Sequence, residues 1–320
     1  MQRRVSTLLL AVGTLFLAAI SLFVGVIDLH PGEIWQGGEA FTLMLDSRLP
    51  RTLAAVIAGA ALAVCGMIMQ MLVRNRFVEP MTAGTGQGAA LGILIVAVVF
   101  PSASILTKMS IATATALASS IGFLMIVRRL PAAQPLLVPL VAMIYGGIIG
   151  AGVAFFAYQW DMLQFIDTWL TGDFSGVMRG RYELLWIAAG MTLLTYLIAD
   201  QFAIAGLGRE ASINLGLNYD QVLILGLLAI SVVAALTVIT VGAIPFVGLI
   251  VPNIVSRQFG DNLRATLPLT ALCGASLVLA SDIVGRVIRA PYEIPVGTVL
   301  GVIGAFVFLW LLYARPSHAR

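Results

Sequence analysis

Charged residues are scarce in this sequence. Only 10% of the 320 residues are Asp, Glu, Lys or Arg, whereas 60% are hydrophobic and the mean hydropathy is +1.02. A soluble protein of this length cannot cover its surface with so few charges. The composition therefore excludes a soluble globular protein and indicates a protein that lies within a membrane.

Cysteine and histidine are also rare. Cys65 and Cys273 lie inside apolar runs, which favours small core residues over a disulfide or a metal pair. His30 and His318 lie near opposite ends of the chain without neighbouring ligands. We therefore expect no metal site. We also expect no catalytic residues and no nucleic-acid partner.

A nucleotide-binding loop is missing as well. The P-loop pattern G-x-x-x-x-G-K-[ST] needs a lysine beside the phosphates. The only lysine, Lys108, follows Thr107 and has no such pattern around it. If ATP drives this protein, a separate chain must hydrolyse it.

Long apolar runs are what the sequence has in abundance. A membrane-spanning helix needs about 20 mostly apolar residues, whereas a membrane β-barrel alternates over segments of about 10 residues. The runs predict an all-α, polytopic membrane protein with a single transmembrane domain over residues 1–320. We expect about ten spans, at residues 5–27, 52–73, 84–100, 109–127, 136–158, 182–202, 221–241, 244–258, 267–285 and 294–313.

Two of these runs have special features. The first follows a basic start, as a signal peptide would, but it exceeds the usual apolar core of about 7–15 residues and no A-x-A site ends it. We expect an uncleaved first span. The eighth run is short and contains Pro245 and Pro252, so we expect a broken or partly re-entrant helix.

Charge predicts the orientation. With an even number of spans both termini lie on one side, and that side carries most of the arginines, whereas most of the acidic residues lie opposite. The positive-inside rule then places both termini in the cytoplasm. Glu79, Asp282 and Glu293 lie near the ends of predicted spans rather than at their centres. This disfavours a carrier with its own proton or sodium relay, although an ion site made only of carbonyl groups stays possible.

The polar segment "GREASINLG", Gly208–Gly216, interrupts two long apolar runs on the predicted cytoplasmic side. It lies in the longest cytoplasmic connection, a region of about residues 203–220. We expect a short helix from Arg209 to Leu215 that ends at Gly216. Spacing alone favours an ordinary loop between helices. The alternative is a docking helix that fits a groove on a cytoplasmic motor protein.

Several blocks resemble one known family. The E-A-x-x-x-x-G pattern of the polar segment is similar to the coupling loop of ABC importer permeases. The block "RLPRTLAAVIAGAALAVCGMIMQMLVRN" resembles the second span of the permeases that serve ferric-siderophore, haem and vitamin B12 importers. "TWLTGDFSG" resembles that family's segment before the sixth span, and residues 241–312 resemble its C-terminal signature. The likeness extends from about Arg48 to Leu312.

The resemblance implies a type II ABC importer permease in the bacterial cytoplasmic (inner) membrane. Such a permease has ten spans and pairs with a second permease subunit, which is the same or a homologous chain. Two ATP-binding subunits carry the ATP, and a periplasmic or lipid-anchored protein delivers the substrate. The permease chain itself binds no cofactor and catalyses no reaction.

The resemblance also assigns roles to residues. Coupling to the ATPase falls on one set within the polar segment: Arg209, Glu210, Ala211, Ser212, Leu215 and Gly216. Docking of the binding protein falls on three arginines of the outer side: Arg48, Arg51 and Arg286. Simple anchoring of span ends is the alternative for these arginines. The fifth span resembles the family's pathway-lining helix, with four candidate lining residues: Met143, Tyr145, Gly146 and Gly150.

Departures from the family pattern narrow the substrate. "RNRFVEP" replaces R-N-P-L-A-D-P, Asn253 replaces the histidine of V-P-H, and "GDNLR" replaces G-x-D-H-R. These variants resemble the branch that imports iron bound to catecholate siderophores. A ferric siderophore is therefore the favoured substrate, with haem or vitamin B12 as the alternative and a stand-alone secondary carrier as the less favoured rival.

Overall fold

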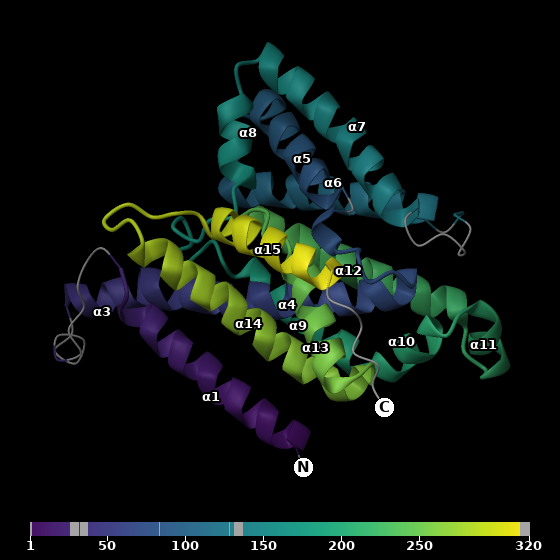
Figure 1. Ribbon diagram of the computed structural model, residues 1–320. Coiled ribbons are helices and arrows are strands. Elements are labelled where there is room, and N and C mark those ends of the chain that lie inside the picture. The colour runs from purple at the N-terminus through teal and green to yellow at the C-terminus, as the bar shows by residue number, and fades with distance from the viewer. Residues whose placement is uncertain are drawn as a thin grey trace.

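The computed structural model describes residues 2–25, 32, 38–82, 84–127, 129–130 and 137–313 (Figure 1). His30 and His318 lie outside the described residues. Within them the regular secondary structure is helical, apart from one isolated bridge between Thr171 and Ala243. The helices are α1 (Gln2–Phe23), α3 (Glu39–Leu43), η1 (Met44–Arg48), α4 (Leu49–Val73), η2 (Pro80–Thr82), α5 (Thr85–Val99), α6 (Ile105–Val127), α7 (Leu137–Gln159), α8 (Leu163–Leu170), α9 (Leu184–Leu197), α10 (Ala199–Gly206), α11 (Arg209–Asn214), α12 (Tyr219–Val241), α13 (Val247–Phe259), α14 (Leu263–Val287) and α15 (Val296–Tyr313).

Each of the ten predicted spans coincides with a helix or, at the sixth, with a bent pair of helices, which confirms the all-α polytopic fold. Six described segments are long and apolar enough to cross a membrane, and the bent pair makes a seventh. Helices α5 and α15 are apolar but shorter. Helix α13 has only 13 residues and contains Pro252, as expected for the eighth span.

The sixth span differs from the prediction of one continuous helix over residues 182–202. Helices α9 and α10 meet at Ile198 with a bend of 65°. Contacts with distant parts of the chain lie beside the bend. Asp200 at the start of α10 forms an ion pair with Arg264 of α14. Phe202 is fully buried, and its ring lies 2.7 Å from the position of a Cβ on Gly226 of α12.

Helix α4 runs through the centre of the molecule. Most of its side chains are buried, and it contacts α1, α9, α10, α12, α13 and α14. Small residues allow these close approaches. A Cβ on Gly59 would lie 2.4 Å from the Gly274 carbonyl oxygen of α14, and one on Gly66 would lie 2.0 Å from the Gly248 carbonyl oxygen of α13. Figure 1 shows α5 to α8 on one side of α4, with α1 and α14 on the other.

The two ends of α4 face different parts of the chain. Helix α3 and η1 lie at its N-terminal end, whereas α10 and α11 lie at its C-terminal end (Figure 1). A helix of 25 residues is about 37 Å long, so α4 spans most of the distance between these two regions. The candidate docking arginines and the candidate coupling helix therefore lie at opposite ends of one buried helix.

Candidate functional site

The polar segment forms a short helix, as the sequence predicts. Helix α11 begins after Gly208, whose φ of +107° is a conformation that side chains rarely adopt. It ends one residue earlier than expected, at Asn214. Gly216 then has a φ of +79°, and the amides of Gly216 and Leu217 bond to the carbonyls of Ile213 and Ser212. This pair of bonds is the Schellman motif, in which a glycine terminates a helix.

The buried face of α11 is held by one hydroxyl group. Ser212 is completely buried, and its Oγ lies 2.6 Å from the Gly208 carbonyl oxygen and 3.0 Å from that of Ile204. The hydroxyl therefore ties α11 to α10. Ser212, one of the six predicted coupling residues, supports the helix from within. Ala211 is half-buried beside it.

The opposite face of α11 is open. Glu210 and Gly216 are exposed, and Ile213 and Leu215 expose 56% and 62% of their surface. Leu207, which the sequence did not single out, is 62% exposed just before the helix. Arg209 forms an ion pair of 3.0 Å with Asp220 at the start of α12. The face thus offers apolar side chains beside one acidic group, the combination that a helix-in-groove contact uses.

A buried cluster of charges lies at the other end of α4. Arg51 pairs with Asp282 and with Glu293, each at 2.8 Å, and Asp282 also pairs with Arg286. Asp282 has 0% of its surface exposed. Arg286 further donates to the carbonyl oxygens of Ser21 (2.9 Å) and Val24 (2.7 Å) at the end of α1. The guanidinium of Arg48 also donates to the Val24 carbonyl oxygen.

This cluster brings together the three arginines that the sequence predicted for docking. All three are buried in the isolated chain, where Asp282 pairs with Arg51 and Arg286, and Glu293 pairs with Arg51. Both acids lie near the ends of predicted spans, but the sequence alone does not indicate their partners. The spacing of Asp282 and Arg286, four residues apart on one helix, was the available signal for one of these pairs.

The four candidate pathway residues of α7 have different surroundings. Met143 is exposed in the isolated chain, whereas the hydroxyl of Tyr145 donates to the Ser119 carbonyl oxygen at 2.7 Å. Gly146 and Gly150 face Gln87 of α5, because a Cβ on either would lie 3.4–3.6 Å from that side chain. The two glycines therefore make room for a polar side chain between α5 and α7, and a role in the pathway stays a prediction for all four.

Comparison with known proteins identifies the family. The sequence from residue 13 to residue 314 matches the FecCD transport family. This chain belongs to the FecCD transport family. The match confirms the resemblance drawn from the sequence blocks, and it covers all the helices from the middle of α1 to α15.

Several curated relatives of this FecCD chain are import permeases. The petrobactin import system permease YclN of Bacillus subtilis is 47% identical over 281 residues, covering 88% of this chain and 89% of YclN. The ferric-anguibactin transport system permease FatD of Vibrio anguillarum is 42% identical over 274 residues, covering 86% of this chain and 87% of FatD. The vitamin B12 import permease BtuC of Vibrio cholerae is 32% identical over 287 residues, covering 89% of this chain and 86% of BtuC.

A solved structure shares the fold. A metal-chelate type ABC transporter in an inward-facing conformation superposes with a TM-score of 0.81 and 25% identity, covering 97% of this chain and 99% of that chain. With the apolar helices described above, this match supports a multi-pass membrane protein of ABC permease architecture.

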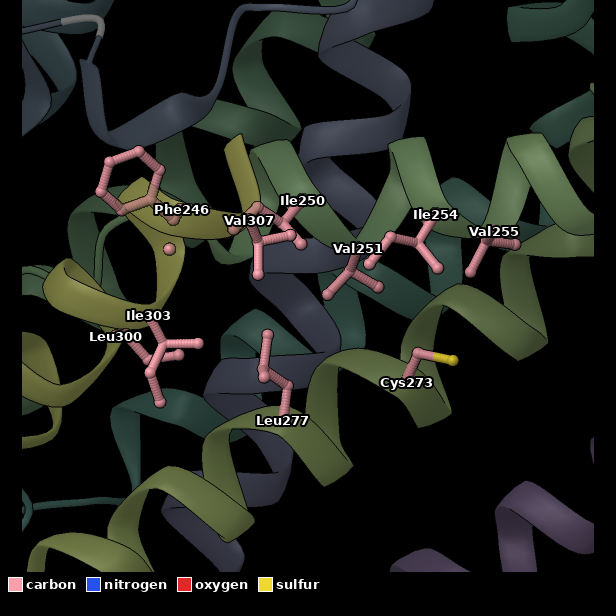
Figure 2. A pocket seen from close by; sticks show the side chains of 11 residues that line it. Phe246, Ile250, Val251, Ile254, Val255, Cys273, Leu277, Leu300, Ile303 and Val307 are labelled. Carbon is pink, nitrogen blue, oxygen red and sulfur yellow. The ribbon is translucent and has the colours of Figure 1, made fainter. Parts of the chain in front are cut away.

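One cavity of the FecCD chain is apolar throughout. It lies between α13, α14 and α15 and has a volume of about 210 Å³ (Figure 2). Aliphatic side chains such as Ile254, Leu277 and Val307 line it together with Phe246 and the thiol of Cys273. Such a lining offers no charge or strong hydrogen-bonding group to a polar iron chelate, because chelate recognition requires placed polar groups. We therefore do not assign the substrate pathway to this cavity.

The buried side chain of Glu79 makes a polar contact that the sequence did not predict. This residue of the "RFVEP" block is buried beside the start of α13, where its Oε1 accepts a hydrogen bond of 3.2 Å from the Phe246 amide. Burial raises the pKa of Glu79 to about 7. The contact fixes the segment between α4 and η2 against the first turn of α13, and only the folded chain brings these two regions together.

Proposed function

We propose that this FecCD chain is the transmembrane permease subunit of an ABC importer that carries a ferric siderophore of the catecholate type. One observation carries the proposal: identity is 47% to a petrobactin permease and 42% to a ferric-anguibactin permease, against 32% to a vitamin B12 permease. All three alignments cover most of the chain, so the three identities compare nearly whole permeases. They favour a ferric siderophore over vitamin B12.

The proposed importer uses ATP on other chains. A second permease subunit, two ATP-binding subunits and a periplasmic or lipid-anchored binding protein complete it in the bacterial inner membrane, with both permease termini in the cytoplasm. Helix α11 receives the movement of the ATPase through its exposed face, and the chain passes substrate inward by alternating access. The exposed Ile213 and Leu215 beside Glu210 support this assignment.

Uptake by whole cells tests the substrate. A bacterial strain that lacks its own ferric-siderophore permeases would express this chain with its cognate ATPase and binding protein. We expect accumulation of iron supplied as ferric petrobactin, and little accumulation of vitamin B12 or haem. Uptake of vitamin B12 or haem in preference to the ferric siderophore would overturn the substrate assignment, and uptake without any ATPase subunit would instead indicate a secondary carrier.

The cluster around Arg51 is the proposed docking site for the binding protein. Among the described residues it brings together the guanidinium groups of Arg48, Arg51 and Arg286 with the carboxylates of Asp282 and Glu293. Arg48 lies where the chain enters α4, and its guanidinium donates to the Val24 carbonyl oxygen at the end of α1. An acidic side chain of the binding protein would be attracted to the guanidinium groups of these arginines.

Replacing Arg48 with glutamine tests the docking site. We expect capture of the binding protein to weaken about tenfold at low salt, and the difference from wild type to shrink as salt screens the charge. Arg179→Gln is the matched control. Arg179 is exposed and lies 3.8 Å from Asp46, which is in η1 at the same end of α4. Surface plasmon resonance at several salt concentrations measures both variants. Equal capture by Arg48→Gln and wild type would contradict the proposal.

A further inference from the structure

Arg74 links the central helix to the segment that leads into α11. It is the first residue after α4, and its φ of +54° lies in the left-handed region. The backbone amide of Arg74 bonds to the Met71 carbonyl at 3.1 Å and so closes the end of α4. The side chain then crosses to α10, where Nε donates to the Gly206 carbonyl oxygen at 3.2 Å.

The guanidinium of Arg74 lies between the end of α10 and the start of α11. Gly206 is the last residue of α10, and a cation is favoured beside the carbonyl groups that end a helix. Gly208, the residue before α11, faces the same group, since a Cβ there would lie only 1.7 Å from Arg74 Nη2. The short turn between the two helices therefore fits around this side chain.

The packing beneath Arg74 is incomplete. A hollow of about 300 Å³ lies between the C-terminal end of α4, the end of α10 and the middle of α13, and its lining includes Met71, Arg74 and Gly206. Met71 approaches Gly206 from α4, with its Cε 3.4 Å from the position of a Cβ there. The hydrogen bond from Arg74 and this contact of Met71 thus join α4 to the end of α10 beside the hollow.

Polar contacts are present at both ends of α4. Arg74 contacts the turn into α11 at one end, and Arg51 pairs with Asp282 and Glu293 at the other. Because rigid secondary-structure elements can carry coupling between distant sites, a displacement at Arg74 could pass along the 25-residue helix α4 to its other end. We propose that Arg74 is a positioning residue that transmits the movement of α11 to α4 during transport, an inference that rests on the proposed function as an ATP-driven importer.

Reconstituted complexes test this role. The wild type, Arg74→Ala, Arg74→Lys and the control Arg76→Ala would be purified with their ATPase subunits, placed in proteoliposomes and supplied with binding protein and ferric petrobactin. Three quantities are measured: the subunits retained on size-exclusion chromatography, the stimulation of ATP hydrolysis by the loaded binding protein, and the substrate transported per ATP hydrolysed.

The expected pattern separates coupling from assembly. Arg74→Ala should retain its ATPase subunits and its basal ATP hydrolysis, but substrate transported per ATP should fall about tenfold, because a hydrogen bond from a charged donor is lost. Arg74→Lys should restore part of the loss, since an ammonium group can still donate to the Gly206 carbonyl. Arg76→Ala should stay within about twofold of wild type, because Arg76 pairs with Asp261 at an exposed site.

Three results would overturn the inference. The first is an amount of substrate transported per ATP by Arg74→Ala that lies within about twofold of wild type. The second is an equal loss of substrate transported per ATP in Arg76→Ala. The third is release of the ATPase subunits from Arg74→Lys. If Arg74→Ala fails to fold, Arg74→Lys carries the same comparison. If wild type transports no ferric siderophore, the proposed substrate fails. The role of Arg74 is then tested by the stimulation of ATP hydrolysis alone. Substitution of Arg74 should reduce this stimulation.

Discussion

Replacing Asp282 with alanine is expected to lower the free energy of unfolding by about 3–5 kcal/mol, because it leaves buried positive charges without a partner. Asp282 is completely buried and pairs with both Arg51 and Arg286. After its removal Arg51 would keep the partly exposed Glu293, whereas Arg286 would lose the carboxylate with which it pairs in the described part of the chain. In detergent, the midpoint of thermal unfolding should fall by roughly 10 °C.

Two controls show whether charge is the cause. The double variant Asp282→Ala with Arg286→Met removes one uncompensated charge together with its partner and should recover part of the lost stability. Asp46→Ala removes an acid from the exposed pair with Arg179 and should change the free energy of unfolding by less than about 1 kcal/mol. If Asp282→Ala alone were as stable as wild type, the cluster would not stabilise the fold as described.

Reversing the charge of Glu210 is expected to separate the permease from its ATPase. Glu210 is exposed in the first turn of α11, so Glu210→Lys should leave the fold intact. It should reduce recovery of the ATPase subunits by about tenfold or more, since an unfavourable charge at an interface costs several kcal/mol. Co-purification with the tagged permease, together with ATP-dependent uptake, measures the effect.

Glu39→Lys is the matched control for this variant. It makes the same exchange at an exposed site in α3, at the other end of α4, and should leave recovery of the ATPase unchanged. Gly216→Val provides an independent test, because a β-branched residue is disfavoured at a φ of +79° and should disturb the end of α11. Normal recovery of ATPase by both α11 variants would remove the coupling role from this helix.

The sequence predicted the helices well because hydropathy over about 20 residues is a local property. It also predicted the short helix of the polar segment, since Gly208 and Gly216 mark its two limits in the chain. The bend at Ile198 was not predicted, because the contacts of Asp200 with Arg264 and of Phe202 with Gly226 depend on the folded arrangement.

The candidate sites were predicted only in part, because contacts between distant residues depend on the folded arrangement. Arg48, Arg51 and Arg286 were selected together, and the structure places them in one cluster. The burial of these arginines and the acids that pair with Arg51 and Arg286 were not predicted, because Glu293 and Asp282 meet Arg51 through long-range packing. Ser212 was selected as a coupling residue, but the period of so short a helix does not reveal which side chain points inward.

Transport by the purified importer tests the central claim most directly. Proteoliposomes containing this permease, its partner permease and the ATPase subunits would be given ferric petrobactin on its binding protein, with ATP enclosed on the side of α11. We predict accumulation of iron that requires both ATP and the binding protein and is lost in Glu210→Lys. Accumulation of iron that continues without ATP, or an ATP-dependent importer that accepts vitamin B12 and not the ferric siderophore, would contradict the account.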